Sequence, residues 1–350
     1  MSGFFRNALT AASPANPAPT TTTLFFTGSS FHAVGYRRGM ERRKLGDRLV
    51  TTMGLGCMPV SFPEHAGDRD RGISVIHRAI DLGLTLLDTA NIYAPSWDAV
   101  GHNEEIVGAA LRSYSGESDL AEVLVATKGG ITRSMGEVWG RDATREGLVR
   151  AAEASRDALG VEVIDLYQLH RPDPALSYAE QVRSLAAVRD EGIARMIGLS
   201  NATLPELHVA IEEVGGPDES GIVSVQNEFS PRFRGDPEVL EACTQLGIAF
   251  LPWSPLGGAD QARGIGDRYA AFAENALDVG ASAHEVVLAW LAAISPVMIP
   301  IPGASRPQTV DSIVRAGDVV LTDEQVERLS ATVPEATSMY PEDQPRPRLR

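Results

Sequence analysis

Short runs of apolar residues, many of them β-branched, alternate along residues 40–334 with longer stretches in which apolar positions recur at helical spacing. In the first such stretch, Ile73, Ile76 and Ile80 lie on one helical face. Glycines stand where several of these helices should end. The eight short runs are the expected strands: Met53–Met58, Leu84–Leu87, Val123–Ala126, Val163–Leu169, Ala194–Leu199, Ile222–Val225, Ile248–Pro252 and Val297–Ile301.

This alternation predicts parallel strands joined by right-handed crossovers. Eight β-then-α units without a break in composition favour a single α/β domain, a closed (β/α)8 or TIM barrel. A doubly wound nucleotide-binding fold is the alternative. However, Gly54–Pro59 lacks the third glycine of the phosphate-binding turn and runs into a proline. Before the first strand, Arg42–Leu45 and Arg48–Thr52 flank Gly46-Asp47, which predicts an N-terminal β-hairpin that plugs the barrel floor.

The two ends of the chain differ from this body. Residues 1–39 contain no Asp or Glu and no apolar pattern for a core. We expect a disordered extension or a mis-assigned start, with Met40 as the true first residue. A transit peptide is the alternative, because such peptides are poor in acidic residues. The barrel should occupy residues 40–334, and residues 335–350 should form a polar C-terminal tail.

Composition excludes several classes of protein. The formal charge is −15, from 31 basic and 46 acidic residues, whereas nucleic acid binding requires a basic surface. No apolar run approaches the ~20 residues of a membrane span. The two cysteines, Cys57 and Cys243, can form neither a disulfide framework nor a four-ligand zinc site. We therefore expect a cytoplasmic protein without a metal, a membrane partner or a nucleic acid partner, and the pattern leaves its oligomeric state open.

Polar residues stand where three consecutive predicted strands end. These are Asp88, Lys128 and His170, and Tyr93 follows Asp88 in the next loop. Functional groups of a barrel lie at the carboxyl ends of its strands, and neighbouring strands are ~4.8 Å apart, so the four side chains should meet on one rim. Only two of the 31 basic residues are lysines, which indicates that Lys128 has a role that needs a compact ammonium.

These four residue types suit proton transfer to a carbonyl oxygen. A nearby ammonium is expected to lower the pKa of Tyr93, while Asp88 supplies the counter-charge for Lys128. His170 can donate a hydrogen bond to a substrate oxygen, and a proton donor without an activated nucleophile suits hydride delivery from a cofactor. Taken singly, each residue also has a structural explanation, such as a helix cap or packing. Their joint position at successive strand ends favours one catalytic site.

At these residues the chain resembles the aldo-keto reductase superfamily, and the resemblance runs from about residue 40 to about residue 333. It implies a (β/α)8 barrel that binds NADP(H) in an extended conformation. It also implies an NADP-dependent oxidoreductase that reduces an aldehyde or ketone to an alcohol, with Tyr93 as general acid. The segments similar to the family's Asp-Thr-Ala-x-x-Tyr motif, Asn-Glu-Glu helix start, lysine strand and histidine strand are Leu87–Tyr93, Asn103–Gly108, Ala126–Lys128 and Asp165–His170.

The resemblance also implies a set of cofactor contacts. Trp253 matches the aromatic residue that stacks on the nicotinamide ring. The nicotinamide carboxamide would be bound by Ser200, Asn201 and Gln226. The pyrophosphate loop, where glycines let backbone N–H groups approach an anion, would include Ser254, Leu256 and Gly257. The adenosine 2′-phosphate would be bound by Gly303, Ser305 and Arg306.

The chain departs from the family pattern in two regions. Thr309 stands where the family usually has Arg or Gln, and Ser312-Ile313 replace a Glu-Asn pair, so we expect only a modest preference for NADPH over NADH. The segment Ala94–His102 is longer than the usual link. Trp97 within it, and Trp139 after Lys128, are expected to form walls of the substrate pocket. Ordinary loop packing is the alternative for both tryptophans.

Two questions about function stay open at the level of sequence. The small-molecule carbonyl substrate could be a simple aldehyde, a pyridoxal-like ring or a keto-sugar. The alternative to an enzyme is an NADPH-binding regulatory subunit without significant turnover. Channel-associated members of the superfamily can retain the four rim residues, so these residues do not decide between the two.

Overall fold

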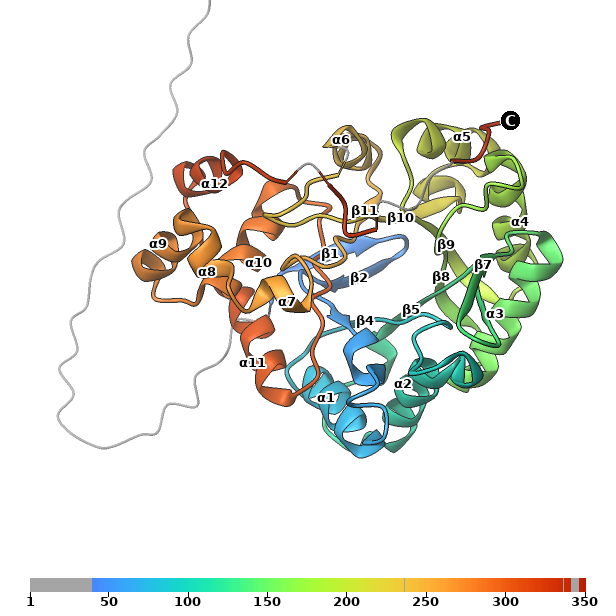
Figure 1. The fold of residues 1–350 in the computed structure, drawn as a ribbon, viewed down its shortest axis with the longest axis horizontal. Coiled ribbons are helices and arrows are strands. Elements are labelled where there is room, and N and C mark those ends of the chain that lie inside the picture. Colours follow the sequence, from blue (N-terminus) through green and yellow to red (C-terminus); the bar gives the residue numbers. More distant parts are fainter. Residues whose placement is uncertain (1–39, 236, 336, 341–345) are drawn as a thin grey trace, which may run out of the picture. The chain divides into compact units, whose positions relative to one another are not determined.

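The computed structural model describes residues 40–350 apart from 236, 336 and 341–345, so the expectations for residues 1–39 lie outside the described residues. A curled parallel sheet of seven strands forms its centre, in the order β11-β10-β9-β8-β5-β4-β3 (Figure 1). The predicted parallel arrangement is confirmed for these strands. Their bounds are β3 (Leu55–Gly56), β4 (Leu86–Asp88), β5 (Leu124–Gly129), β8 (Ile164–Leu169), β9 (Ala194–Ser200), β10 (Ile222–Gln226) and β11 (Ala249–Phe250).

The eighth predicted run, near residues 297–303, joins the two edges of this sheet without forming a regular strand. The Phe250 N–H in β11 donates to the carbonyl of residue 297 at 2.8 Å, and the Gly56 N–H in β3 donates to that of Pro302 at 3.0 Å. Isolated parallel bridges accompany both contacts. Pro300 and Pro302 have no N–H to donate, which explains why the run pairs only in isolated bridges.

Helices surround the sheet on its outer side (Figure 1). Most of them follow a strand, and the apolar face predicted for the first is confirmed at Ile76 and Ile80, which are buried, while Ile73 is partly buried against the core. The main helices are α1 (Arg69–Asp81), α2 (His102–Ser113), α3 (Arg145–Leu159), α4 (Tyr178–Asp190), α5 (Leu204–Val214), α6 (Pro237–Leu246), α10 (Ala283–Ile294) and α11 (Pro307–Ala316). Shorter or additional helices are α7 (Ala259–Ala262), α8 (Ile265–Arg268), α9 (Ala270–Val279) and α12 (Asp323–Ser330).

Glycine ends several helices as the sequence predicts. Gly160 is the C-cap of α3 with a φ of 69°, and Gly83, Gly192 and Gly247 also have positive φ values. Glycine adopts this left-handed conformation without the steric cost of a Cβ atom, so each helix can stop and the chain can turn toward the next strand.

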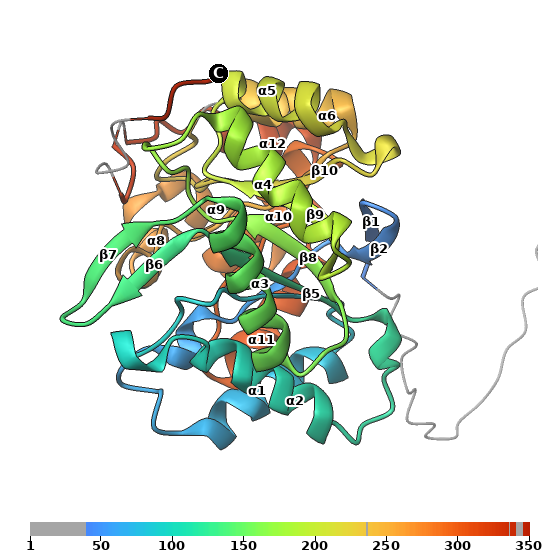
Figure 2. The same ribbon diagram turned by 90° about the vertical axis from the view of Figure 1, so that its right-hand side faces the viewer.

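Two antiparallel hairpins lie at opposite ends of the barrel (Figure 2). The first pairs β1 (Arg42–Leu45) with β2 (Arg48–Thr51), and its Leu45 and Val50 are fully buried in a cluster with inward-facing strand residues such as Leu124 and Met196. The second pairs β6 (Ile131–Ser134) with β7 (Val138–Arg141) and follows directly after β5. It therefore lies at the end where the parallel strands finish.

The described parts of the C-terminal tail pack against the body. Arg346 forms an ion pair with the buried Glu206, and the Tyr178 N–H at the start of α4 donates to the Arg348 carbonyl at 2.8 Å. Nearer the strand ends, the Ser338 hydroxyl donates to Glu228 at 2.6 Å. These contacts are polar, as the composition of the tail suggests.

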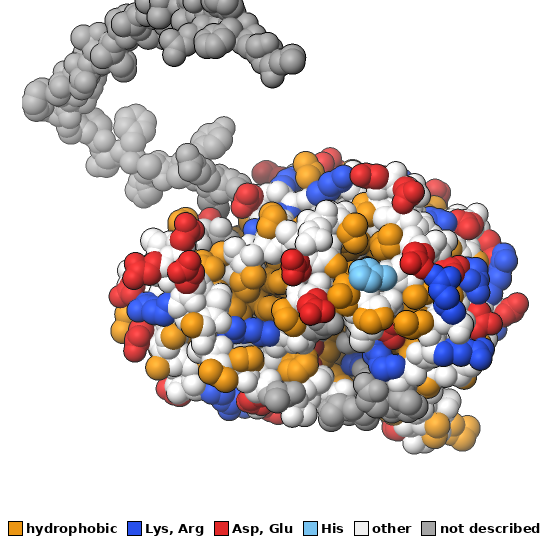
Figure 3. All heavy atoms as spheres, turned by 90° about the horizontal axis from the view of Figure 1, so that it is seen from above, with side chains coloured by type: hydrophobic (Ala, Val, Ile, Leu, Met, Phe, Trp, Pro, Cys, Tyr) orange, Lys and Arg blue, Asp and Glu red, His pale blue; other side chains and the backbone are white. Residues whose placement is uncertain are grey.

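Among the described residues, no single helix is long and apolar enough to cross a membrane. Helices α9 and α10 reach that length and hydropathy only together, and an angle of 94° separates them. Over the face that carries α5, α6 and α12, acidic and basic side chains are interspersed (Figure 3).

Candidate active site

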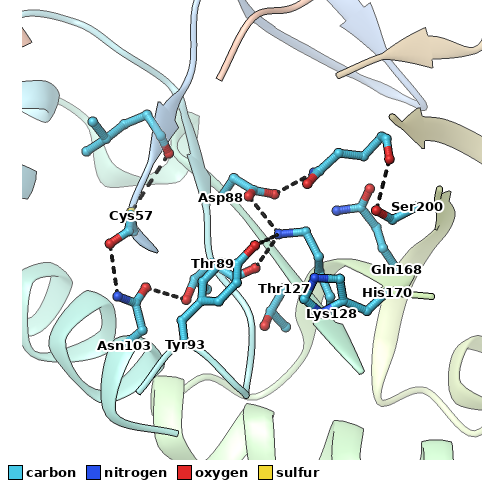
Figure 4. Close-up of polar contacts among 12 residues, drawn as sticks. Cys57, Asp88, Thr89, Tyr93, Asn103, Thr127, Lys128, Gln168, His170 and Ser200 are labelled. Atoms are coloured by element: carbon cyan, nitrogen blue, oxygen red, sulfur yellow. Dashed lines mark hydrogen bonds and ion pairs between the residues drawn. The ribbon is translucent and has the colours of Figure 1, made fainter. Parts of the chain in front are cut away.

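The ends of β4 and β5 bring Asp88 and Lys128 into direct contact (Figure 4). Lys128 Nζ donates to Asp88 Oδ1 at 2.7 Å, and both side chains are almost completely buried. The two strands are hydrogen-bonded neighbours, with Asp88 opposite Ala126 in the register. The predicted counter-charge for the buried ammonium is therefore present, and it satisfies the rule that buried charges occur in pairs.

Tyr93 completes the set of partners of Lys128. Lys128 Nζ also donates to the Thr89 carbonyl at 2.7 Å and to the Tyr93 hydroxyl at 3.4 Å, and it lies 5.0 Å from the centre of the tyrosine ring. An ammonium has three N–H donors, so these partners and Asp88 account for all of them. The orientation of Nζ is thus fixed, with one N–H directed at the phenol oxygen.

His170 follows the end of β8 and packs edge-on against Tyr93, with ring centres 5.8 Å apart. Burial, together with the charges of Lys128 and Arg171, lowers the pKa of His170 well below its ordinary value. Its Nδ1 is buried and has no hydrogen-bond partner among the described residues, so a second ring N–H would be costly there. The imidazole is therefore neutral at neutral pH and keeps one N–H to donate.

The pKa of Tyr93 differs from the expectation drawn from its neighbours. Burial raises this pKa above the ordinary value of tyrosine, and the ammonium of Lys128 offsets only part of that increase. The expected lowering is therefore wrong as a net effect, because removing a phenolate from water costs more than one ion contact returns. The pKa of Lys128 is raised, since Asp88 and Tyr93 together outweigh the effect of burial.

A chain of hydrogen bonds connects Asp88 with four residues predicted to contact the cofactor. Trp253 Nε1 donates to Asn201 Oδ1 at 3.1 Å, and Asn201 Nδ2 donates to the Ser200 hydroxyl at 2.9 Å. The hydroxyl donates to the Gln226 carbonyl at 2.9 Å, and Gln226 Nε2 donates to Asp88 Oδ2 at 2.8 Å. The structure thus brings together residues from the ends of β9, β10 and β11 with the rim.

The predicted pyrophosphate loop follows directly after Trp253. Ser254 has a φ of 48° and Gly257 one of 80°, and the Gly257 N–H donates to the Ser254 carbonyl at 2.7 Å. A positive φ in a residue other than glycine is strained and often occurs at functional sites. Leu256 is partly buried against the main core, so it anchors this tight turn.

The predicted 2′-phosphate residues lie at the start of α11, where Arg306 is the N-cap. Arg306 is exposed and its Nε donates to the Thr309 hydroxyl at 3.3 Å, while Ser305 is half-buried and Gly303 is exposed. The guanidinium of Arg306 and the hydroxyl of Ser305 are both donors that phosphate oxygens can accept from.

The two tryptophans predicted as pocket walls belong to neighbouring segments. Trp97 begins a short 3-10 turn, and its backbone N–H donates to Glu137 Oε1 at 3.0 Å. Trp139 is on β7, is 53% exposed and lies 4.9 Å from the guanidinium of Arg133. Arg133 also binds the Ala94 carbonyl at 2.7 Å and so holds the two segments together. Contact between either indole and a substrate stays a prediction.

Several residues near the rim were not predicted as functional. The Thr89 hydroxyl donates to Asn103 Oδ1 at 2.6 Å, and Asn103 Nδ2 donates to the Cys57 carbonyl at 2.9 Å, which fixes the loop after β4. Behind β5, the Thr127 hydroxyl donates to Glu104, and burial raises the pKa of Glu104 to about 7. The sequence signal that could have predicted these contacts is the pair Asn103-Glu104 at the start of α2, because both side chains are buried there.

Tyr340 of the C-terminal tail also reaches this region. Its ring centre lies 5.7 Å from that of Trp253, and the guanidinium of Arg171 lies 5.1 Å from the Tyr340 ring. Nothing in the local sequence of the tail indicates this position, because the contacts of Tyr340 join residues far apart in the chain.

Comparisons with known proteins agree with this arrangement. Residues 52–333 match the sequence profile of the Aldo/keto reductase family. An uncharacterized oxidoreductase of Schizosaccharomyces pombe is 33% identical over 289 residues, which cover 82% of this chain and 88% of that protein. Pyridoxine 4-dehydrogenase of Escherichia coli is 28% identical over 295 residues, which cover 81% and 96% of the two chains.

Solved structures show the same fold. An aldo-keto reductase from Klebsiella pneumoniae in complex with NADPH superposes with a TM-score of 0.70 at 24% identity, covering 85% of this chain and 97% of that one. The family match spans most of the chain, and the S. pombe relative exceeds 30% identity over most of its length. The chain therefore belongs to the aldo/keto reductase family.

Proposed function

We propose that this protein is an NADP(H)-dependent reductase that converts an aldehyde or ketone to an alcohol. The observation that carries the proposal is the buried Lys128 ammonium, which contacts Asp88 and the Tyr93 hydroxyl at once. His170 packs against the same tyrosine. In this proposal Tyr93 is the proton donor and His170 the hydrogen-bond donor beside it, and membership in a family of oxidoreductases supports the same chemistry.

The rim residues would act on the carbonyl oxygen. Tyr93 has a raised pKa and so carries its proton at neutral pH, ready to transfer it as the oxygen gains negative charge. The ammonium of Lys128 stabilises the phenolate that remains, and Asp88 keeps the ammonium in place. Neutral His170 donates a hydrogen bond that orients the carbonyl. NADP(H), when bound, supplies the hydride.

The donors along the strand ends fit such a cofactor. The side-chain amides of Asn201 and Gln226 and the hydroxyl of Ser200 match the donors and acceptors of a carboxamide. Trp253 offers a flat aromatic face beside them. The turn with Ser254, Leu256 and Gly257 would approach the pyrophosphate, and Gly303, Ser305 and Arg306 the 2′-phosphate. The K. pneumoniae complex with NADPH, which shares the fold, supports this assignment.

The remaining parts of the fold have complementary roles in this proposal. The β1–β2 hairpin would close the amino-terminal end of the barrel, since Leu45 and Val50 pack among inward-facing residues. The loops with Trp97 and Trp139 would form the pocket wall. The charge of −15 and the interspersed surface charges favour a small-molecule substrate over a nucleic acid, and a cytoplasmic location is part of the proposal.

A carbonyl panel tests the function directly. Simple aldehydes, keto-sugars and pyridoxal, the last suggested by the E. coli relative, would be mixed with NADPH and the loss of its absorbance followed. We expect turnover of at least one class. Tight NADPH binding without turnover of any compound would favour the regulatory subunit instead, and absence of both binding and turnover would refute the proposal.

A further inference from the structure

A basic side chain from α1 reaches the predicted phosphate site on α11. Arg71 Nε donates to the backbone carbonyl of Ser305 at 2.7 Å, across 234 positions of sequence. Arg71 Nη1 contacts His65 Nδ1 at 3.1 Å, and because arginine has no acceptor the imidazole nitrogen accepts this bond. Arg71 Nη2 forms no hydrogen bond among the described residues.

The two partners of Arg71, the Ser305 carbonyl and the acceptor nitrogen of His65, carry no negative charge. In this respect Arg71 differs from Arg78 on the same helix. Arg78, two turns further along α1, donates to Asp311 on α11 through Nε at 2.8 Å and Nη2 at 2.6 Å. That ion pair holds α1 against α11 and cancels the charge of Arg78. Asp68, the N-cap of α1, accepts the backbone N–H of Arg71 at 3.0 Å, and among the described residues the adjacent Asp70 forms no ion pair with Arg71.

Like Arg71, Arg306 has no acidic partner among the described residues. Its Nε binds the neutral hydroxyl of Thr309, and among the described residues neither Arg306 nor Arg71 has a carboxylate within ion-pair distance. The chain carries a net charge of −15, and many of its other arginines are paired with acids. Two guanidiniums without an acidic partner therefore lie near Ser305, since Arg306 is the next residue and Arg71 binds the Ser305 carbonyl, and together they can attract an anion.

We propose that Arg71 binds the adenosine 2′-phosphate as a second cationic residue besides Arg306. The inference rests on the proposed use of NADP(H). It adds Arg71, on α1, to the residues Gly303, Ser305 and Arg306 that were predicted to bind the 2′-phosphate. Thr309 stands where the family usually has Arg or Gln, and Arg71 would bring a cation to this region from another helix. The 2′-phosphate is dianionic, so a site with two guanidiniums and the Ser305 hydroxyl matches its charge and its acceptors.

The first test measures binding rather than turnover. Dissociation constants for NADPH and NADH come from quenching of tryptophan fluorescence, and those for adenosine 2′,5′-bisphosphate and adenosine 5′-monophosphate from displacement of NADPH. We expect Arg71→Ala to weaken the two ligands that carry a 2′-phosphate about tenfold, the effect of one charge-assisted hydrogen bond. Affinities for NADH and the monophosphate should stay unchanged. Arg78→Ala, the matched control on α1, should leave the ratios as in the unmodified protein.

A second variant distinguishes recognition of charge from support of the loop. Arg71→Lys keeps the cation and loses the bond from Nε to Ser305, so it should retain part of the preference for the 2′-phosphate. That preference should fall as salt concentration rises, because part of it is electrostatic attraction. If Arg71 only braces the backbone at Ser305, Arg71→Ala weakens NADH as much as NADPH, and lysine restores nothing. That result overturns the inference.

Failure of this inference is separable from failure of the proposed function. If the unmodified protein binds the bisphosphate far more tightly than the monophosphate and Arg71→Ala keeps the same ratio, NADP(H) use stands and the role of Arg71 is wrong. If the unmodified protein binds none of the four ligands and reduces no carbonyl compound, the proposed function fails, and the role of Arg71 fails with it.

Discussion

The rim around Lys128 and the start of α11 hold their charged side chains in opposite ways. At the rim, the Lys128–Asp88 pair is buried and every N–H of the ammonium has a partner. At α11, Arg306 is exposed and Arg71 half-buried, and each binds only neutral partners within the described chain. Buried charges with fixed partners suit the stabilisation of a reacting group, whereas uncompensated charges near the surface suit capture of an anion.

This contrast predicts unequal consequences of mutation. Removing a partner at the rim leaves a buried charge without compensation and alters the proton donor itself. Removing one arginine at α11 weakens an interaction that solvent and salt already screen. Changes at the rim should therefore affect catalysis strongly and cofactor choice little, and changes at α11 should do the reverse.

The largest effect is expected for Lys128→Arg. A planar, forked guanidinium cannot replace a compact ammonium that contacts Asp88, Thr89 and Tyr93 together. We expect kcat for carbonyl reduction to fall ~100- to 10,000-fold, the range for loss of general acid catalysis. Steady-state kinetics measure this, and NADPH binding should persist.

Lys44→Arg is the matched control for that variant. Lys44 is the other lysine of the chain, is largely exposed and lies 3.7 Å from Asp218 at the surface. Its replacement should leave kcat unchanged. A near-normal kcat in Lys128→Arg would remove the proposed role of the ammonium and with it one side of the comparison.

A smaller effect is expected at α11. Arg306→Ala should lower kcat/KM with NADPH ~10- to 150-fold, which is the value of a charge-assisted hydrogen bond of about 1.5 to 3 kcal/mol, and leave NADH kinetics nearly unchanged. Measuring both cofactors in both proteins tests this. Arg315→Ala, on the same helix but paired with Glu285 at 2.8 Å, is the control and should keep the original preference. An unchanged ratio in Arg306→Ala would show that another group binds the phosphate.

The carboxyl group behind the rim gives a prediction for stability. Burial raises the pKa of Glu104 to about 7, so the folded protein binds a proton that the unfolded chain has already released above pH ~4.3. Stability from this group is therefore complete below that pH and is lost as pH rises to about 7. Glu104→Gln keeps an acceptor for Thr127 and cannot ionise. Between pH 5 and pH 8, the free energy of unfolding of this variant should therefore fall by ~1 to 3 kcal/mol less than that of the unmodified protein.

Denaturant titrations of both proteins at pH 5 and pH 8 measure the difference for Glu104. Glu105, the next residue, is exposed, so Glu105→Gln should follow the pH dependence of the unmodified protein. Parallel curves for Glu104→Gln and the unmodified protein would mean that Glu104 ionises normally, for instance because water reaches it.

The smallest effect is expected from removing residues 1–39. Their composition offers no apolar pattern for a core, and the described barrel accounts for its own hairpin and strands. A protein that starts at Met40 should match the full chain in melting temperature and in kcat/KM. A loss of several degrees or a large drop in activity would show that the extension packs on the body.

The sequence predicted the contacts at the rim better than those at the start of α11. Asp88, Lys128 and His170 each end a strand, and parallel strands bring their carboxyl ends together, so position along the chain determined proximity. The direction of the Tyr93 pKa was wrong because the depth of burial depends on the packed structure. The contact of Arg71 with Ser305 could not be predicted, since it joins helices at opposite ends of the chain.

For the eighth predicted run, near residues 297–303, the sequence contained the reason why no regular strand forms. Its position between β11 and β3 follows from the pattern, and its interruption follows from Pro300 and Pro302, which were visible in the sequence. The position of Tyr340 beside Trp253 has no such signal, because polar contacts of the tail determine it.

The most direct test of the central claim is a comparison of Tyr93→Phe with the unmodified enzyme. Phenylalanine preserves the ring that packs against His170 and removes only the hydroxyl that Lys128 contacts. If Tyr93 is the proton donor, kcat for carbonyl reduction falls at least ~100-fold while the dissociation constant for NADPH, measured by fluorescence, stays within about twofold. A Tyr93→Phe enzyme that reduces the same substrate at a rate close to that of the unmodified protein would contradict the account.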